Sequence, residues 1–348
     1  MEVSAGTAFL EALADDVDRL LTAEPEVRAD ADDSVHQMRV ATRRLRSVLR
    51  SYRMLLRRDR ADAVTAELKW LAELLGVARD AEVRAERFDK LLAAHRDQLT
   101  AVAEIDTATG KPADSADDVP DRGHPGSSSD SGPAAPVAAV GAHHVSAPLA
   151  SPADLERATT RLVTAERARY DGAHARILAA LDSDRYRTLR DTLSDWKTDA
   201  PLRPSRAAVP AGEFFRVVLQ RDHERVEAFI RAEPSAAEDD RIELLHDIRK
   251  SAKRLRYSCE AAAEILGPDA IDLGRRAKHL QTVLGDHRDA IESHAAIQTR
   301  ATEAEAAGEN PALYTILATA EAQSAHHELT RYPAAAEALT GQVTLLRS

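Results

Sequence analysis

With 348 residues, the chain is long enough to bury a substantial core as one or two domains. Its net charge of −11 argues against an indiscriminately basic nucleic-acid binder, and its single cysteine, Cys259, excludes an internal disulfide and a cysteine-based metal cage. Aromatic residues make up only 4% of the chain, whereas alanine, leucine, arginine and acidic residues dominate, which favours helices.

The N-terminal residues show the pattern of an amphipathic helix. Residues 5–23 lack the basic start of a signal peptide, and no apolar run in the chain approaches the roughly 18 residues of a membrane span. We therefore expect a cytoplasmic protein with no membrane partner. Pro25 and the acidic run 30–33 are expected to end this helix, and Asp33 or Ser34 can cap the next one.

Residues 35–57 predict a helix with one cationic face. At about 100° per residue, the basic residues of this stretch fall within an arc of roughly 80°, opposite the apolar residues, and span about 21 Å. They are His36, Arg39, Arg43, Arg46 and Arg50. Arginine forks match the geometry of phosphate oxygens, so a stripe of this length suits an extended polyanion.

The next residues predict further helices and then a linker. Helices are expected at 60–75 and 78–103, separated by Gly76 as a C′ glycine, so residues 1–106 predict an up-down helical half. Residues 107–152 are rich in Pro, Gly, Ser, Ala and Asp and predict a disordered linker. The second half, 153–348, is expected to contain helices at 153–182, 184–197, 211–231, 240–266, 269–284, 287–307, 311–331 and 333–346.

The basic stripe occurs a second time, about 210 residues later. The second copy consists of His246, Arg249, Lys253, Arg254 and Arg256, which match His36, Arg39, Arg43, Arg44 and Arg46 of the first. A following block repeats at nearly the same offset, with Lys69, Gly76, Arg79 and Asp80 matching Lys278, Gly285, Arg288 and Asp289. Two blocks in one order indicate an internal duplication, which predicts an all-α fold of two pseudo-twofold-related four-helix bundles.

The Leu-Gly and Arg-Asp residues of the second block suit a turn between two helices. Glycine would end one helix, and Asp80 or Asp289 near the start of the next would favour its dipole. On this interpretation most of the block is structural, although Arg79 and Arg288 can also face the basic stripe.

Several interpretations of the stripes remain open. A solvated basic face is the plainest, but the repetition and the scarcity of acids at i+3 or i+4 favour polyanion binding. His36 and His246 can instead be the phosphorylatable nucleophiles of a phosphotransfer or phosphatase-like helical enzyme. A metal site is disfavoured because positions 40 and 250 are Val and Lys, and we expect no cofactor. Nucleic acid is a weaker partner, because the stripe lacks interleaved aromatic residues.

The paired motifs resemble the CHAD domain, the conserved histidine α-helical domain. They read H-x-x-R-V-x-x-R-R-L-R from His36 and H-x-x-R-K-x-x-K-R-L-R-Y from His246, each followed by an L-G-x-x-R-D block. The resemblance covers most of the chain outside 107–152 and implies one CHAD domain built of two four-helix bundles around a basic groove or pore. It also implies binding of inorganic polyphosphate and, in some members, residence at polyphosphate granules.

Many CHAD proteins are fused to a CYTH-type triphosphate tunnel domain. This chain has no room for that β-barrel and shows no E-x-E-x-K motif, so we expect a binding protein and not an enzyme. Each stripe points away from the core of its own bundle, so the two are expected to face one shared site. The candidate polyphosphate-binding residues are His36, Arg39, Arg43, Arg44, Arg46, Arg50, Lys69, Arg79, His246, Arg249, Lys250, Lys253, Arg254, Arg256, Lys278 and Arg288.

Overall fold

The structure is a computed structural model that describes residues 2–108 and 150–341. Within these ranges the chain is almost entirely helical and forms no strand, which confirms the predicted all-α class. No helix in these ranges is long and apolar enough to cross a membrane. The helices are α1 (Ala5–Arg28), α2 (Ser34–Ser51), α3 (Arg58–Ala108), α4 (Pro152–Thr159), α5 (Ala165–Leu181), α6 (Asp184–Asp199), α7 (Pro204–Ala207), α8 (Ala211–Ala232), α9 (Glu238–Leu266), α10 (Pro268–Ala306) and α11 (Ala312–Thr340).

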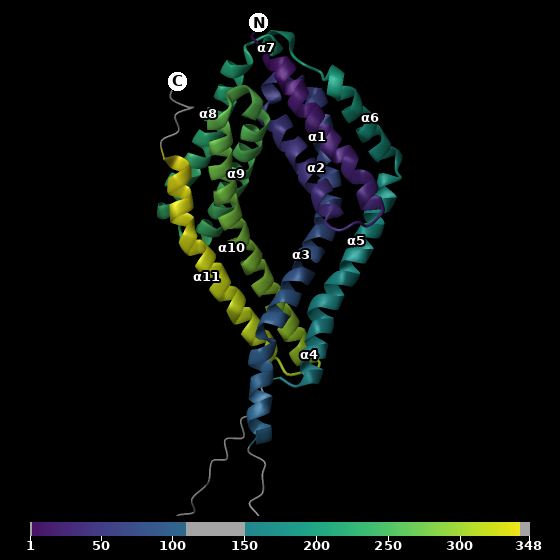
Figure 1. Cartoon of the computed structure of the whole chain (residues 1–348), viewed down its shortest axis with the longest axis vertical. Helices are drawn as coiled ribbons and strands as arrows, with labels where there is room; N and C mark the ends of the chain where they lie inside the picture. The colour runs from purple at the N-terminus through teal and green to yellow at the C-terminus, as the bar shows by residue number, and fades with distance from the viewer. Residues whose placement is uncertain (1, 109–149, 342–348) are drawn as a thin grey trace, which may run out of the picture.

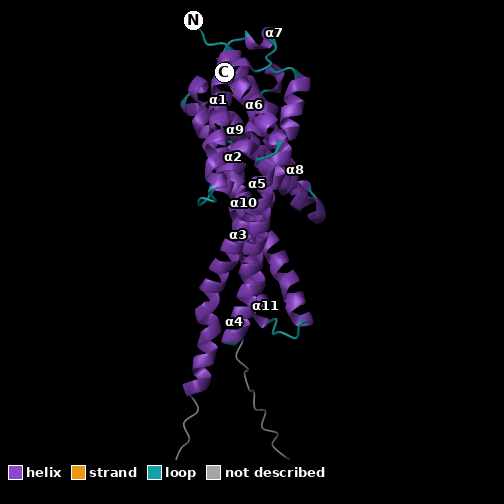
Figure 2. Cartoon of the chain, turned by 90° about the vertical axis from the view of Figure 1, so that its right-hand side faces the viewer, coloured by secondary structure: helices purple, strands orange, loops and turns teal. Residues whose placement is uncertain are grey.

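The helices form two groups that face each other (Figure 1). One group contains α1, α2, α3, α5 and α6, and the other contains α8, α9, α10 and α11. Near one end of the molecule the groups meet where α2 packs against α9 and α1 against α8. At the opposite end α3 and α4 contact α11. In the side view of Figure 2 the helices are crowded in the upper half and spread apart in the lower half.

Two hydrophobic cores correspond to these two meeting places. The larger core joins the apolar faces of α1, α2, α8 and α9, where the ring of Tyr52 lies 5.9 Å from Phe9 and 4.8 Å from Phe215. The Tyr52 hydroxyl also donates a hydrogen bond of 2.9 Å to the carbonyl of Ser258 on α9. The smaller core contains Phe88 and Leu92 of α3 together with apolar residues of α10 and α11. Burial therefore ties the two groups together at both ends.

Several predicted helix ends are wrong. Gly76 lies inside α3, Gly285 inside α10 and Pro333 inside α11, so each pair of predicted helices is one long helix. Among the described glycines, a positive φ occurs only at Gly267 and Gly308, so neither Gly76 nor Gly285 has a helix-ending conformation. Each helix continues through the position where we predicted a break, because the turns on both sides of that position are buried against neighbouring helices. This packing outweighs the local helix propensity.

Helix α1 likewise continues through Pro25 to Arg28 instead of ending near residue 23. Pro25 is exposed, whereas Ala23 and Val27 beside it are buried in the larger core. The stripe helix α2 ends at Ser51, earlier than expected, and a single 3₁₀ turn follows at Arg53–Leu55. The predicted helix 153–182 is interrupted by one π-helical turn at Thr160–Thr164.

The predicted linker 107–152 lies mostly outside the described residues. Its edges belong to helices, since α3 extends to Ala108 and Ser151 caps α4 through a reciprocal capping box with Asp154. The helices that follow differ from the expected division into halves, because α5 packs against α3 and α6 against α1. Apolar residues of α6, such as Leu189 and Leu193, complete the core of the N-terminal group. Tertiary packing, and not the linker, separates the two groups.

Candidate anion-binding site

The two basic stripes meet at the seam between α2 and α9. A pocket of about 310 Å³ opens there between α2, α8 and α9, and we call it the cation pocket. Seven of its lining residues are arginines or lysines: Arg43, Arg46, Arg50, Arg225, Lys250, Lys253 and Arg254. Asp247 is the single carboxylate among the lining residues, and it forms an ion pair of 2.5 Å with Lys250. The pocket is therefore strongly positive.

Most of these basic side chains have no negative partner among the described residues. In the ranges that the structure describes, no carboxylate lies within ion-pair distance of Arg43, Arg46, Arg50 or Lys253, or of the neighbouring Arg249. The Nε atoms of Arg46 and Arg249 are buried without a hydrogen-bond acceptor. Unpaired buried charge is costly, so the arrangement is suited to an anion supplied from outside.

Two pKa shifts show that the stripes share one electrostatic environment. Burial, together with the charges of Arg43, Arg249 and Arg39, lowers the pKa of Lys253 to about 6. Burial also lowers the pKa of Arg43 to about 10, with a contribution from Arg39 on the same helix and Arg249 on the other. Because charges on α2 act on a lysine of α9, and the reverse, the two helices present a single cationic surface.

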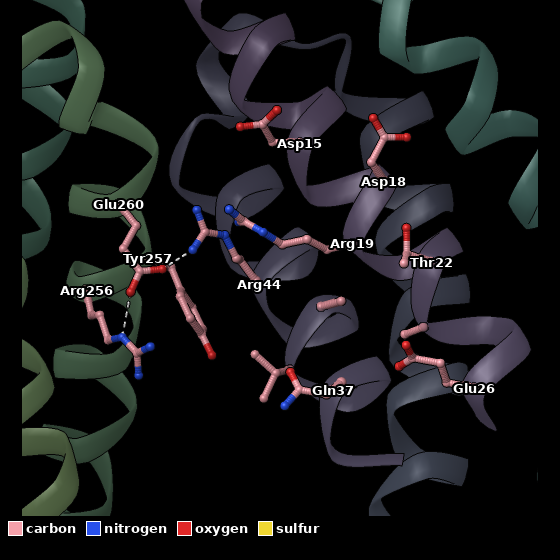
Figure 3. Close-up of a pocket in the computed structure, with 13 residues that line it drawn as sticks. Asp15, Asp18, Arg19, Thr22, Glu26, Gln37, Arg44, Arg256, Tyr257 and Glu260 are labelled. Atoms are coloured by element: carbon pink, nitrogen blue, oxygen red, sulfur yellow. Dashed lines mark hydrogen bonds and ion pairs between the residues drawn. The ribbon is translucent and has the colours of Figure 1, made fainter. Parts of the chain in front are cut away.

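Other predicted site residues have carboxylate partners, and Arg44 and Arg256 share one of them. Arg44 forms ion pairs with both Asp16 of α1 and Glu260 of α9, and so connects the two groups of helices. Arg256 pairs with the same Glu260 at 2.7 Å. Figure 3 shows Arg44, Arg256 and Glu260 at a second pocket, of about 680 Å³, which Tyr257 also lines. Arg44 and Arg256 thus stabilise the seam and leave fewer donors for a ligand.

Arg254 also has a carboxylate partner, and it belongs to a buried polar network. Asp222 of α8 accepts hydrogen bonds of 2.7 Å from the hydroxyls of Ser51 and Ser258, and it pairs with Arg254 at 3.1 Å. Arg254 also donates to the hydroxyl of Ser51 at 3.0 Å. This network fixes one wall of the cation pocket. Neither Asp222 nor the pocket residue Arg225 was singled out from sequence, because α8 carries no repeated motif.

The two histidines lie next to arginines of the second sequence block. Burial lowers the pKa of His36, and the charge of Arg79 adds to the effect. His246 is in contact with Arg288, and burial followed by that charge lowers its pKa. Both imidazoles are therefore neutral near pH 7. His246 lines a pocket of about 460 Å³ with Arg249 and Arg288, beside the cation pocket.

The remaining predicted residues are separate from the cation pocket. Lys69 is exposed on α3 and lies 3.6 Å from Glu73, and Lys278 is exposed on α10. Arg79 pairs with Glu82 at 2.9 Å and with Asp33 at 3.4 Å, and Arg288 pairs with Glu292 at 2.6 Å. Of the sixteen candidates, the structure brings Arg43, Arg46, Arg50, Lys250, Lys253 and Arg254 together in one pocket, with Arg39 and Arg249 adjoining them.

The acidic residues of the second block have a role that the predicted turn did not reveal. Because α3 and α10 are continuous, Asp80 and Asp289 do not lie at helix N-termini. Asp80 forms an ion pair of 3.2 Å with Arg39 instead. Burial raises the pKa of Asp289, and the nearby charge of Arg249 opposes that shift. Each acid therefore faces the arginine of its own stripe.

The fold and the site together define a class of all-α protein in which two groups of helices enclose a cationic seam. The family model described as the CHAD domain matches residues 11–298, which is most of the chain. The protein belongs to the CHAD domain family. The resemblance predicted from the two histidine motifs is thereby confirmed.

Two curated relatives are similar over most of this chain. The uncharacterized proteins Rv2226 and MT2285, from two strains of Mycobacterium tuberculosis (ATCC 25618 / H37Rv and CDC 1551 / Oshkosh), are each 32% identical to it over 318 residues. The match covers 90% of this chain but 49% of each relative. The chain thus spans about half the length of these curated relatives.

Two solved structures share the fold at low sequence identity. PptA from Streptomyces chartreusis is 16% identical, with a TM-score of 0.63 and coverage of 95% of this chain and 99% of that one. The CHAD domain from the plant Ricinus communis is 18% identical, with a TM-score of 0.56 and coverage of 98% and 94% respectively. At such identities the likeness supports the arrangement of helices alone.

Proposed function

We propose that this chain is a non-enzymatic binding module for inorganic polyphosphate. The observation that carries the proposal is the cation pocket, where three arginines of α2 meet Lys253 of α9 and none of the four has a carboxylate within ion-pair distance among the described residues. A ligand that supplies closely spaced negative charges would remove the repulsion between these side chains. Membership of the CHAD family points to the same ligand.

The shape of the cationic surface favours a long anion over a small one. The stripe on α2 runs from Arg39 to Arg50, about three helical turns, and the stripe on α9 adjoins it. A single phosphate can reach only one part of such a surface, whereas a chain of phosphates reaches both helices. Tyr257 is the only aromatic residue lining the cation pocket, and it is buried, so the pocket offers no platform for stacking bases.

A salt titration tests the proposal. Long-chain polyphosphate should bind with an affinity that falls by orders of magnitude between about 50 mM and about 500 mM NaCl, because several counterions are released on binding. DNA of matched charge, measured by the same calorimetry, should bind much more weakly at every salt concentration. An affinity for polyphosphate that stays flat with salt, or equals that for DNA, would reject the proposal.

Binding of this kind would bring the protein to polyphosphate granules, which is the location that we propose for it. The affinity would arise from many weak phosphate contacts, so the protein could exchange between the granule surface and solution.

A phosphotransfer reaction at His36 or His246 is the alternative function. Its support is that both imidazoles are neutral near pH 7 and lie next to an arginine. Incubation with radiolabelled polyphosphate and then with acid, which cleaves phosphohistidine, distinguishes the two. We expect no acid-labile label on the wild-type protein. Label that is lost in a His36→Gln, His246→Gln variant would establish the alternative.

A further inference from the structure

In both copies of the repeat, a stripe arginine lies against a glycine of the neighbouring helix. A Cβ atom added to Gly76 of α3 would lie 3.7 Å from both the Nε and an Nη atom of Arg39. A Cβ atom added to Gly285 of α10 would lie 3.3 Å from the Nε and 3.4 Å from an Nη atom of Arg249. The second distance is shorter than an ordinary van der Waals contact, so Arg249 occupies space that a side chain would need.

Backbone conformation does not explain these glycines. Both lie inside long helices, and neither has the positive φ that the described chain shows at Gly267 and Gly308. Glycine inside a helix is unfavourable relative to alanine. The close approach of a guanidinium is the feature that the two sites share, and at Gly285 an alanine would disturb it.

The two arginines differ in what holds their charge. Asp80 pairs with Arg39 at 3.2 Å, so this arginine is tethered to α3. Arg249 has no carboxylate within ion-pair distance among the described residues. It is still near enough to Asp289 for its charge to lower the pKa of that carboxyl. The charge of Arg249 also acts on Lys253 and Arg43 of the cation pocket. Of the two, Arg249 is the arginine that is available to a ligand.

We propose that Gly285 is a positioning residue for anion binding, whose missing side chain lets the guanidinium of Arg249 lie against α10 at the edge of the cation pocket. The inference rests on the proposed binding of polyphosphate. It assigns Arg249, in the second copy of the repeat, a direct contact with that ligand. Gly76 has the same relation to Arg39 but leaves more room, so the two positions should respond differently to substitution.

Binding measurements on alanine variants test this assignment. Gly285→Ala should weaken long-chain polyphosphate binding by about tenfold. It should also reduce the salt slope, which is the slope of the logarithm of the binding constant against the logarithm of the salt concentration, by about one, as expected for the loss of one phosphate contact. Gly76→Ala should have a much smaller effect, because its Cβ fits at an ordinary contact distance. Gly172→Ala on α5 is the control, since no atom lies within 4 Å of its added Cβ.

A double-mutant cycle shows whether Gly285 acts through Arg249. In an Arg249→Ala background, Gly285→Ala should cause no further loss of affinity and no further change in salt slope. An equal loss in both backgrounds would overturn the proposal, because Gly285 would then act by some other route. So would a Gly285→Ala variant that binds like the wild type.

Thermal unfolding without ligand provides a readout that does not depend on polyphosphate. Gly172→Ala should raise the melting temperature through helix propensity. Gly285→Ala should raise the melting temperature by the same amount as Gly172→Ala only in an Arg249→Ala background. In the presence of Arg249, steric conflict between the added Cβ and the guanidinium should offset the gain. If this pattern holds while the wild type fails to bind polyphosphate, the proposed function is wrong and the contact stands. If Gly285→Ala stabilises the wild type fully, the contact is not tight and the inference is wrong.

Discussion

Lys253 is surrounded by cations from two helices. Arg39 and Arg43 act on it from α2, and Arg249 and Arg256 act on it from α9. Its pKa of about 6, far below the ordinary lysine value, leaves the amine mostly neutral in the free protein at pH 7. A phosphate chain in the cation pocket would raise that pKa again, because a negative charge favours the protonated amine. Binding would therefore take up a proton.

The affinity for long-chain polyphosphate should fall as the pH rises from about 6 to about 9, by up to about tenfold per pH unit for one coupled proton. The Lys253 amine must be protonated to bind phosphate, and the free-energy cost of protonating it increases as the pH rises through this range. Calorimetry across the range should show the fall in the wild type and a flatter profile in Lys253→Met. Lys253→Arg, which stays charged, should keep the affinity and lose the dependence. A profile that is unchanged in Lys253→Met would assign the proton uptake elsewhere, for example to His36 or His246.

At the scale of helices, α2 and α9 each bury one face and present a cationic face to the seam. If both stripes contact one ligand, each raises the effective concentration of the ligand at the other. If each group of helices bound its own anion, removal of one stripe would leave the other site intact. Substitutions confined to one helix separate these two cases.

We expect Arg43→Ala with Arg46→Ala on α2, or Arg249→Ala with Lys253→Ala on α9, to reduce affinity for long-chain polyphosphate by orders of magnitude. Tripolyphosphate, which is too short to reach both helices, should bind weakly to the wild type and lose affinity in only one of the two variants. Arg167→Ala with Arg176→Ala, two exposed residues of α5, removes the same charge away from the pocket and should change little. Wild-type binding of long chains by either stripe variant would disprove a shared site.

At the scale of the molecule, a second junction holds the two groups of helices together away from the cation pocket. Arg87 of α3 forms two hydrogen bonds, of 2.6 and 2.5 Å, with the carboxylate of Glu321 on α11. Glu321 is only 1% exposed and also accepts a hydrogen bond from Ser293 of α10. The pair crosses from one group to the other, next to the smaller core.

Arg87→Met should lower the free energy of unfolding by about 3 kcal/mol, because it leaves the buried carboxylate of Glu321 without its cation. Urea denaturation measures the loss, and polyphosphate affinity should be nearly unchanged. Arg58→Met, which breaks an exposed pair with Asp62 on α3, should have almost no effect on stability. If Arg87→Met weakened polyphosphate binding as strongly as a stripe variant, the two junctions would not be independent.

The sequence by itself determined the helical class, most helices and the cationic faces of α2 and α9. These properties depend on the 3.6-residue period and on which side of a helix a residue occupies, and both are local. The repetition of His36 and Arg39 as His246 and Arg249 also pointed to the family. The internal duplication stays a prediction, while the structure shows that the two copies occupy α2–α3 and α9–α10.

Only the tertiary structure decided which cations have partners. Arg43 and Arg44 are neighbours on one helix, yet Arg43 lines the cation pocket and Arg44 pairs with Asp16 and Glu260. Pairing depends on side chains contributed by other helices, such as Glu260, which lies 216 positions from Arg44 in the chain, and helical periodicity does not encode such contacts. Gly285 was misinterpreted for the same reason: a local pattern predicts a helix end, whereas the reason for the glycine is an arginine on another helix.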